Sequence, residues 1–160
     1  MARKKRVWYP GAVYHITNRG NRRSDIFRDE EDYQVYLDNL RQVKKRYPFE
    51  IYSYCLMTNH IHLQIETFDV EIWHIMKDIN QYYTKYFNNK YSLIGHLFQG
   101  RYKSEVIEDN AHNIQTSRYI HLNPVSASMV ELPIDYKWSS YDIYMGKRED
   151  GQETSSDYKG

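Results

Sequence analysis

The segment FEIYSYCLMTNHIHLQIE (residues 49–66) decides the fold, because it contains two strand-like runs with only Thr58 and Asn59 between them. Two such runs joined by so short a turn are typical of a β-hairpin. Side chains alternate between the two faces of a strand, so the second run is expected to point its aliphatic residues toward a core and its polar residues away from it. The aliphatic set is Ile61, Leu63 and Ile65, and the polar set is His60, His62, Gln64 and Glu66.

Two helices are predicted, one before the hairpin in the sequence and one after it. Residues 29–47 begin with Asp29 as the N-cap and an acidic first turn, and apolar residues then recur at helical spacing until Pro48. Residues 70–91 carry one apolar stripe at the same spacing. The stripe consists of Ile72, Ile75, Met76, Ile79, Tyr82, Tyr83 and Tyr86.

The remaining elements complete an α+β pattern. AVYHITN (12–18) and YKSEVIE (102–108) are strand-like, and residues 110–122 form a third helix. This helix is expected to end at Asn123, because the residue before a proline is disfavoured in the helical region. The order β-α-β-β-α-β-α predicts a ferredoxin-like split βαβ unit with a four-stranded antiparallel sheet backed by two helices, followed by a C-terminal helix.

The length of 160 residues favours one domain, expected over residues 1–145 with a basic N-terminal arm. Residues 146–160 are poor in hydrophobic side chains and are expected to be a disordered tail. No run approaches the roughly 18 to 20 apolar residues that span a bilayer, and no apolar stretch follows the first charges, so neither membrane insertion nor export by a standard signal is expected. Cys55 is the only cysteine, which excludes an internal disulfide and a cysteine-based zinc site and favours the reducing cytoplasm.

The net charge of +1 hides an uneven distribution of basic residues. The first 24 residues contain seven basic residues and no acidic residue. Such asymmetry is typical of a segment that contacts phosphates. A solubilising basic tail explains residues 3–6 equally well, but it explains Arg19, Arg22 and Arg23 less well, because they follow a strand.

The histidine pair is a candidate metal site. Alternate residues on one face of a strand lie about 7 Å apart, close enough for two imidazoles to lean onto one divalent ion about 2.1 Å from each. Because Cys55 is alone, any metal would be held by nitrogen and oxygen ligands. The alternative is that His60 and His62 are ordinary solvent-facing strand residues, and for an isolated His-x-His pattern this alternative is favoured.

The segment RYIHLNP (118–124) supplies the partners that such a site needs. Tyr119 and Asn123 are four residues apart and face the same way on a helix, within a polar stripe. A tyrosine hydroxyl becomes a competent nucleophile when a metal polarises the target phosphate. The alternative is that Tyr119 only packs on the sheet. Three other tyrosines compete for the nucleophile role but fit the apolar stripe of residues 70–91; they are Tyr82, Tyr83 and Tyr86.

Six segments in unbroken order resemble the single-tyrosine HUH transposases, and among these the REP-associated tyrosine transposase group. The segments are YHITNRGNRR (14–23), YCLMTNHIHL (54–63), YFNNKY (86–91), GHLFQGRYKS (95–104), RYIHLNPV (118–125) and WSSY (138–141). The resemblance covers about residues 3–145. It implies DNA transposition by a ferredoxin-like endonuclease domain that cuts and rejoins single-stranded DNA through a 5′-phosphotyrosine intermediate.

The resemblance also implies roles for single residues. His60 and His62 correspond to the metal pair, Tyr119 to the catalytic tyrosine, and Asn123 to the position where relatives carry a glutamine that completes the metal shell. The cofactor would be Mg²⁺ or Mn²⁺, the substrate a single-stranded DNA hairpin or palindrome, and the assembly a homodimer. The implied DNA contacts are Arg19, Arg22, Arg23, Arg101 and Lys103.

Two other functions remain open on the residues alone. A non-catalytic module that binds single-stranded DNA or RNA would also suit an aromatic-rich sheet, with Tyr52 and Tyr54 sharing a strand face. A metal-dependent phosphohydrolase would use activated water in place of Tyr119. The His-x-His pattern paired with a helix tyrosine favours the transposase, because a pure binding module needs neither.

Overall fold

All four predicted strands and all three predicted helices are present in the structure, a computed structural model that describes residues 7–146. In chain order the elements are β1 (Val13–Arg19), η1 (Asn21–Arg23), α1 (Glu30–Arg46), β2 (Phe49–Leu56), β3 (His60–Thr67), α2 (Ile72–Tyr91), β4 (Lys103–Ile107), α3 (Asn110–Ser126), η2 (Pro133–Asp135) and α4 (Tyr141–Tyr144). This order confirms the ferredoxin-like α+β fold. The expectations for the basic arm at residues 3–6 and for the tail beyond residue 146 lie outside the described residues.

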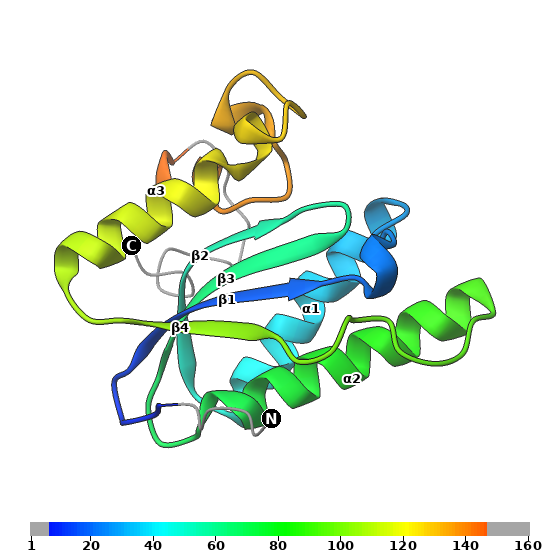
Figure 1. The fold of residues 1–160 in the computed structure, drawn as a ribbon, viewed down its shortest axis with the longest axis horizontal. Helices are drawn as coiled ribbons and strands as arrows, with labels where there is room; N and C mark the ends of the chain where they lie inside the picture. The colour runs from blue at the N-terminus through cyan, green and yellow to red at the C-terminus, as the bar shows by residue number, and fades with distance from the viewer. Residues whose placement is uncertain (1–6, 147–160) are drawn as a thin grey trace.

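The strands form one antiparallel sheet in the order β2-β3-β1-β4. β1 and β3 are the central strands, and their register places Arg19 opposite His60 and Thr17 opposite His62. Figure 1 shows α1 and α2 on one side of the sheet and α3 on the other. The sheet therefore has a core face covered by α1 and α2 and a second face that meets α3.

The core lies between the sheet and the helix pair α1 and α2. Alternate residues of β1 and β3 point into it and are fully buried, as are the inward residues of both helices. The strand residues are Tyr14, Ile16, Ile61, Leu63 and Ile65. Within residues 7–146, no helix is both long enough and apolar enough to cross a membrane.

The predicted end of the third helix is wrong, because α3 continues through Pro124 to Ser126. A proline removes one backbone hydrogen bond and crowds the preceding turn, which disfavours but does not forbid a helix. Pro124 is buried here, and so is Ile120 one turn earlier. Their packing stabilises the last turn against the lost hydrogen bond, and this keeps Asn123 helical.

The apolar stripe of α2 differs from the prediction at two positions. The residues that face the core are Ile72, Ile75, Met76, Ile79, Tyr83 and Phe87. Tyr82 is 43% exposed, and Tyr86 is only partly buried. The stripe follows the 3.6-residue helical period from Tyr83 to Phe87, so Tyr82 falls beside it.

Candidate functional site

The histidine pair lies on the sheet face that meets α3. The aliphatic residues between and beyond the histidines are buried in the core on the opposite face, so alternation turns His60 and His62 toward α3, as the sequence predicts. Their ring centroids are 5.0 Å apart with the planes at 83°. His62 is only 4% exposed, and His60 is half-buried. The two imidazoles are therefore close neighbours and have little contact with solvent.

α3 brings Tyr119 and Asn123 to the histidines. The ring centroid of Tyr119 lies 5.6 Å from that of His62, and the Asn123 side chain forms a hydrogen bond with His60. Tyr119 and Asn123 share a face of α3 because the helix continues past Pro124. A single chain thus brings together all four residues that the sequence proposes for the metal and the nucleophile.

Gln64 fixes the position of α3 over this face. Its Oε1 accepts hydrogen bonds of 2.6 Å from the Ser53 hydroxyl and 2.6 Å from the Ser117 hydroxyl. Its Nε2 donates 3.0 Å to the backbone carbonyl of Asn113 and also contacts the Asn113 side chain. Gln64 is fully buried, so all of its polar atoms need partners, and α3 supplies most of them. This anchor lies just before Tyr119 on the helix.

Both histidines are held in the neutral form that binds a metal. Burial, with the charges of His15 and His60 when protonated and of Arg19, lowers the pKa of His62 from 6.5 to about 3. Burial and Arg19 also lower the pKa of His60, while the hydrogen bond with Asn123 raises it. A metal needs an imidazole whose nitrogen lone pair is free, so no proton has to be displaced at neutral pH.

Tyr119 remains accessible although it adjoins buried histidines. Its side chain is 55% exposed, and it lies at the edge of an open groove of about 360 Å³. The groove is lined by His15, Glu105, His112, Gln115, Thr116 and Tyr119. A polymeric ligand could therefore reach the tyrosine hydroxyl from solvent.

His15 is a site residue that the sequence reasoning did not single out. Its Nε2 lies 3.0 Å from Nδ1 of His62, and its ring centroid is 5.8 Å from that of Tyr119. The signal was available, because alternation in AVYHITN sets His15 on the face opposite Tyr14 and Ile16. What the sequence did not reveal is that β1 pairs with β3, which puts this face beside His62.

The predicted phosphate contacts Arg19, Arg22 and Arg23 lie at the end of β1 and in η1, and all three are exposed. Arg22 and Arg23 have φ of 55° and 58°, a left-handed conformation that costs about 1 kcal/mol or more for a non-glycine residue. Gly20 makes this turn possible, because a Cβ there would lie 2.2 Å from the carbonyl oxygen of Ser24. The turn is thus a strained loop that presents two guanidinium groups.

Arg101 and Lys103 approach the same end of the sheet from the other side. Lys103 is the first residue of β4 and lies opposite Thr17, while the loop before it donates a hydrogen bond of 2.8 Å from Gln99 N to the carbonyl oxygen of Arg19. Arg101 and Lys103 are both exposed. The two predicted basic groups therefore flank the strand ends that carry His60 and Arg19.

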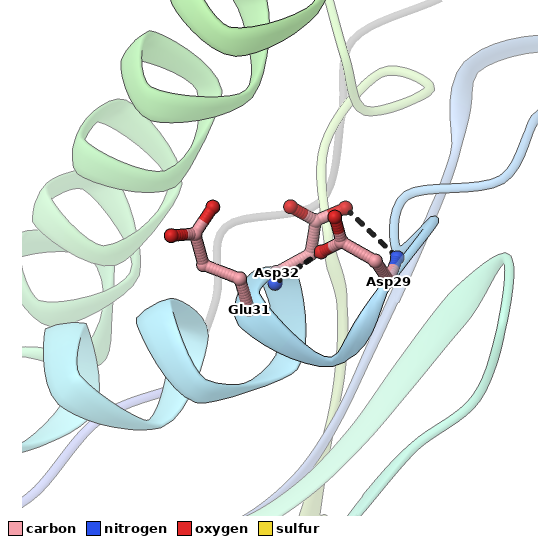
Figure 2. Close-up of side chains that lie close together, drawn as sticks. All are labelled: Asp29, Glu31 and Asp32. Carbon is pink, nitrogen blue, oxygen red and sulfur yellow. Dashed lines mark hydrogen bonds between the residues drawn. The ribbon is translucent and has the colours of Figure 1, made fainter.

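Three carboxylates at the start of α1 form a second candidate metal site. Figure 2 shows the carboxylates of Asp29, Glu31 and Asp32 gathered at the start of α1, the one group of three within residues 7–146 close enough to share a cation. The Lys90 ammonium already contacts all three, at 2.7 Å from Asp29, 2.7 Å from Glu31 and 3.0 Å from Asp32. The Lys90 ammonium therefore occupies the position that a bound metal cation would take.

The buried member of this acidic group is fully used in packing α1 against α2. Asp32 accepts hydrogen bonds from Tyr91 at 2.5 Å, from Tyr86 at 2.7 Å and from the backbone N–H of Arg28 at 2.8 Å. Burial alone would raise the pKa of Asp32, but these bonds and Lys90 lower it to about 2. We assign the group as an ion-pair clasp between the two helices and not as a metal site.

The two tyrosines that would serve a pure binding module do not lie together on an exposed face of the sheet. A bulge between Ile51 and Ser53 shifts the register of β2. Tyr54 is consequently 1% exposed and part of the core, while Tyr52 is half-buried and hydrogen-bonded to Glu66. The expectation that Tyr52 and Tyr54 share a face is wrong. The bulge adds one extra residue to β2 between Ile51 and Ser53, and this reverses the alternation of faces beyond it, so Tyr52 and Tyr54 lie on opposite faces.

The competing tyrosines of α2 lie on the far side of the sheet from the histidines. Tyr83 is fully buried and donates a hydrogen bond to the carbonyl oxygen of Ile26. Tyr86 is committed to Asp32 in the clasp. Of the tyrosines weighed for the nucleophile role, Tyr119 is therefore the one whose ring contacts His62.

A family model described as "Transposase IS200 like" matches residues 9–123 of the chain. A solved structure described as a REP-associated tyrosine transposase bound to a REP hairpin aligns over 100% of this chain and 92% of its own, with 22% identity and a TM-score of 0.76. A protein from Deinococcus radiodurans R1, named as a transposase candidate, aligns over 74% of this chain and 95% of its own, with 17% identity and a TM-score of 0.52. No curated protein sequence matches the chain significantly. At these identities the two solved structures support the fold.

Proposed function

Since the chain belongs to the IS200-like transposase family, we propose that it cuts and rejoins single-stranded DNA through a 5′-phosphotyrosine intermediate on Tyr119. One observation carries the proposal: Tyr119 and Asn123 of α3 meet His62 and His60 of β3 within one chain. A tyrosine nucleophile beside two neutral imidazoles is an arrangement for attack on a metal-bound phosphate. Neither the Tyr119 side chain nor the two imidazoles belong to the hydrophobic core.

The donor set fits a divalent metal. His60 and His62 supply neutral imidazole nitrogens, and Asn123 supplies a side-chain carbonyl oxygen beside His60. Asparagine is one carbon shorter than the glutamine that the resemblance implies, but α3 lies close enough for its side chain to reach His60. Mg²⁺ is bound mainly through oxygen ligands, whereas imidazole is a ligand of transition metals, so of the two expected ions this set favours Mn²⁺.

The metal would polarise the scissile phosphate and neutralise the charge that develops on it. Tyr119 gives up its proton to water, and its Oη forms a bond to phosphorus. The bond from phosphorus to the 3′ oxygen of the preceding nucleotide breaks, and that oxygen takes up a proton and leaves as a 3′-hydroxyl. The products are a 5′-phosphotyrosine and a free 3′ end. Because the phosphodiester energy is kept in the tyrosyl bond, a 3′-hydroxyl can attack in reverse and rejoin a strand.

The proposed substrate is a DNA hairpin with a single-stranded flank. The relative of highest TM-score given above is described as bound to a REP hairpin, and the exposed basic residues at the strand ends of this chain would bind the phosphate backbone of such a substrate. Arg19, Arg22 and Arg23 lie beside the turn that precedes His60, and Arg101 and Lys103 lie across β1 from it. A backbone held between the two groups would pass the metal pair.

The test is an adduct assay with end-labelled single-stranded DNA hairpins and Mn²⁺. We expect an SDS-resistant complex in which the protein is joined to the 5′ phosphate of the fragment downstream of the break, and a released upstream fragment with a 3′-hydroxyl. The Tyr119→Phe variant should bind the hairpin and form no adduct. Tyr82→Phe, an exposed tyrosine on the far side of the sheet, is the matched control and should retain activity.

The other outcomes assign the rival functions. Cleavage without an adduct would make the protein a phosphohydrolase that uses water. Binding without cleavage would make it a non-catalytic single-stranded nucleic-acid module. A homodimer is part of the proposal, with each active site complete within its own chain.

A further inference from the structure

The Nδ1 atoms of both histidines of the proposed metal pair are engaged by neighbouring side chains. Nδ1 of His60 lies 2.8 Å from Oδ1 of Asn59, and Nδ1 of His62 lies 3.0 Å from Nε2 of His15. An uncharged imidazole carries one proton, and the hydrogen bond made by one ring nitrogen determines which nitrogen keeps it. The partners of Nδ1 therefore decide whether Nε2 is free to bind a metal.

Asn59 favours one tautomer of His60. The Nδ2 amide of Asn59 donates to the carbonyl oxygen of Arg23 at 3.4 Å, so its Oδ1 is the atom that faces His60. A carbonyl oxygen only accepts hydrogen bonds, so Nδ1 of His60 must carry the proton. The lone pair of His60 is then on Nε2.

The position of Asn59 is itself fixed by the loop that carries the basic turn. The backbone N–H of Gly20 donates to the carbonyl oxygen of Asn59 at 2.8 Å, and the backbone N–H of Ile26 donates to that of Thr58 at 2.9 Å. Gly20 and Ile26 lie on either side of Arg22 and Arg23. Asn59 therefore connects the loop that presents the two arginines directly to a metal ligand.

His15 allows the same arrangement at His62. It is fixed on β1, where it lies opposite Gln64 in the register with β3, and its ring stacks on that of His62 with centroids 5.2 Å apart. A neutral His15 with its proton on Nδ1 accepts from Nδ1–H of His62 through Nε2. The Thr17 hydroxyl lies 3.5 Å from the same His62 atom and can accept as well.

We propose that Asn59 and His15 are positioning residues that hold His60 and His62 in the tautomer with the proton on Nδ1, so that both Nε2 atoms are presented to one metal ion. The proposal rests on the metal site of the proposed function. Outer partners of this kind orient metal-binding imidazoles, and their removal typically costs about 10- to 100-fold in metal affinity. Asn59 also links His60 to the arginine turn through its hydrogen bond to the carbonyl oxygen of Arg23.

The same distances allow a rival role for His15, because two ligands of one ion can also lie about 3 Å apart when each is about 2.1 Å from the metal. In that case His15 would bind the metal through Nε2, and His62 would bind it through Nδ1. The two roles predict opposite proton positions on His62. They also predict different numbers of imidazoles bound to the metal, two for a positioning residue and three for a ligand.

The experiment uses the ¹⁵N-labelled full chain without metal at neutral pH. Long-range ¹H–¹⁵N spectra distinguish a protonated from an unprotonated ring nitrogen, and we expect Nδ1 protonated and Nε2 unprotonated in both His60 and His62. Asn59→Leu and His15→Phe keep the approximate shape but remove the acceptor. Asn59→Leu should give a mixture of the two tautomers of His60, and His15→Phe a mixture of those of His62. Each variant should weaken Mn²⁺ binding about 10- to 100-fold. Asn59→Asp and His15→Gln retain an acceptor and should preserve both properties.

Electron-spin-echo measurements on the Mn²⁺ complex should count two coordinated imidazoles. Unchanged tautomers and unchanged Mn²⁺ affinity in Asn59→Leu and His15→Phe would overturn the proposal, and so would three imidazoles or an unprotonated Nδ1 on either histidine. The tautomer measurement needs neither metal nor DNA. If the chain forms no DNA adduct, the proposed function fails while the tautomer result still decides the roles of Asn59 and His15.

Discussion

The ring of Tyr119 meets the ring of His62 edge-on, with the centroids 5.6 Å apart and the planes at 90°. This contact joins the middle of α3 to the second central strand, two elements that are far apart in the chain. It places an exposed tyrosine next to a buried imidazole whose pKa is lowered to about 3. The predictions below test the chemistry of this contact and the parts of the fold that support it.

Tyr119→Phe should reduce adduct formation to background, because it removes only the nucleophilic oxygen. The side chain is 55% exposed, so the free energy of unfolding should change by less than about 0.5 kcal/mol. Hairpin affinity should stay within a factor of two or so of the parent chain. Adduct yield on denaturing gels and affinity by fluorescence anisotropy separate the two effects, and normal adduct formation by this variant would exclude Tyr119 as nucleophile.

A mixture of Tyr119→Phe and His60→Ala should remain inactive. Each variant lacks one half of the site, and the structure places both halves in one chain, so mixing restores no complete site. Exchange of α3 between two chains would instead restore about a quarter to a half of the activity in mixed dimers. The adduct assay on co-expressed and purified mixtures decides between these arrangements, and sedimentation velocity shows whether the chain is dimeric.

The metal-free chain should lose stability as the pH falls below about 6.5. The pKa of His62 is lowered to about 3 and that of His121 to about 4. Below pH 6.5 these two histidines therefore bind protons in the unfolded chain but stay neutral in the folded chain. Between pH 6.5 and 5 this costs up to about 2 kcal/mol for each histidine. Urea unfolding at both pH values measures the loss. His62→Asn should reduce the pH dependence.

Arg22→Gly should stabilise the fold and weaken DNA binding. Glycine adopts a φ of 55° without the strain that arginine bears there, so the free energy of unfolding should rise by about 0.5 to 1 kcal/mol. The lost phosphate contact should lower hairpin affinity and reduce the slope of log affinity against log salt by about 1. Lys45→Gly, on the exposed side of α1, should lower stability and leave the salt slope unchanged. A variant that alters stability alone would remove Arg22 from the proposed DNA contacts.

Lys90→Met should destabilise the chain, because it leaves the buried carboxylate of Asp32 without its cation. Lys85→Met on the exposed side of the same helix should cost less than about 0.5 kcal/mol. Mn²⁺ affinity should be unchanged in both variants and in Asp29→Asn. A weaker Mn²⁺ site in Asp29→Asn would show that the acidic group, and not the histidine pair, binds the metal.

Local patterns in the sequence were enough for most of the fold. The capping box of Asp29 and Asp32 begins α1 where the acidic first turn predicts, and Thr58 and Asn59 form the hairpin turn. The errors arise where packing overrides a local preference. Burial carries α3 through Pro124, and the bulge in β2 sends Tyr54 into the core.

The orientation of His60 and His62 follows from their own segment, because strand alternation depends only on neighbouring residues and on which of them are aliphatic. Their partners do not follow from any segment. Tyr119 and Asn123 reach the histidines because α3 packs on the polar face of the sheet, and His15 reaches His62 because β1 pairs with β3. These are contacts between distant parts of the chain. They form only when burial of the opposite face fixes the order of the strands and leaves this face for α3.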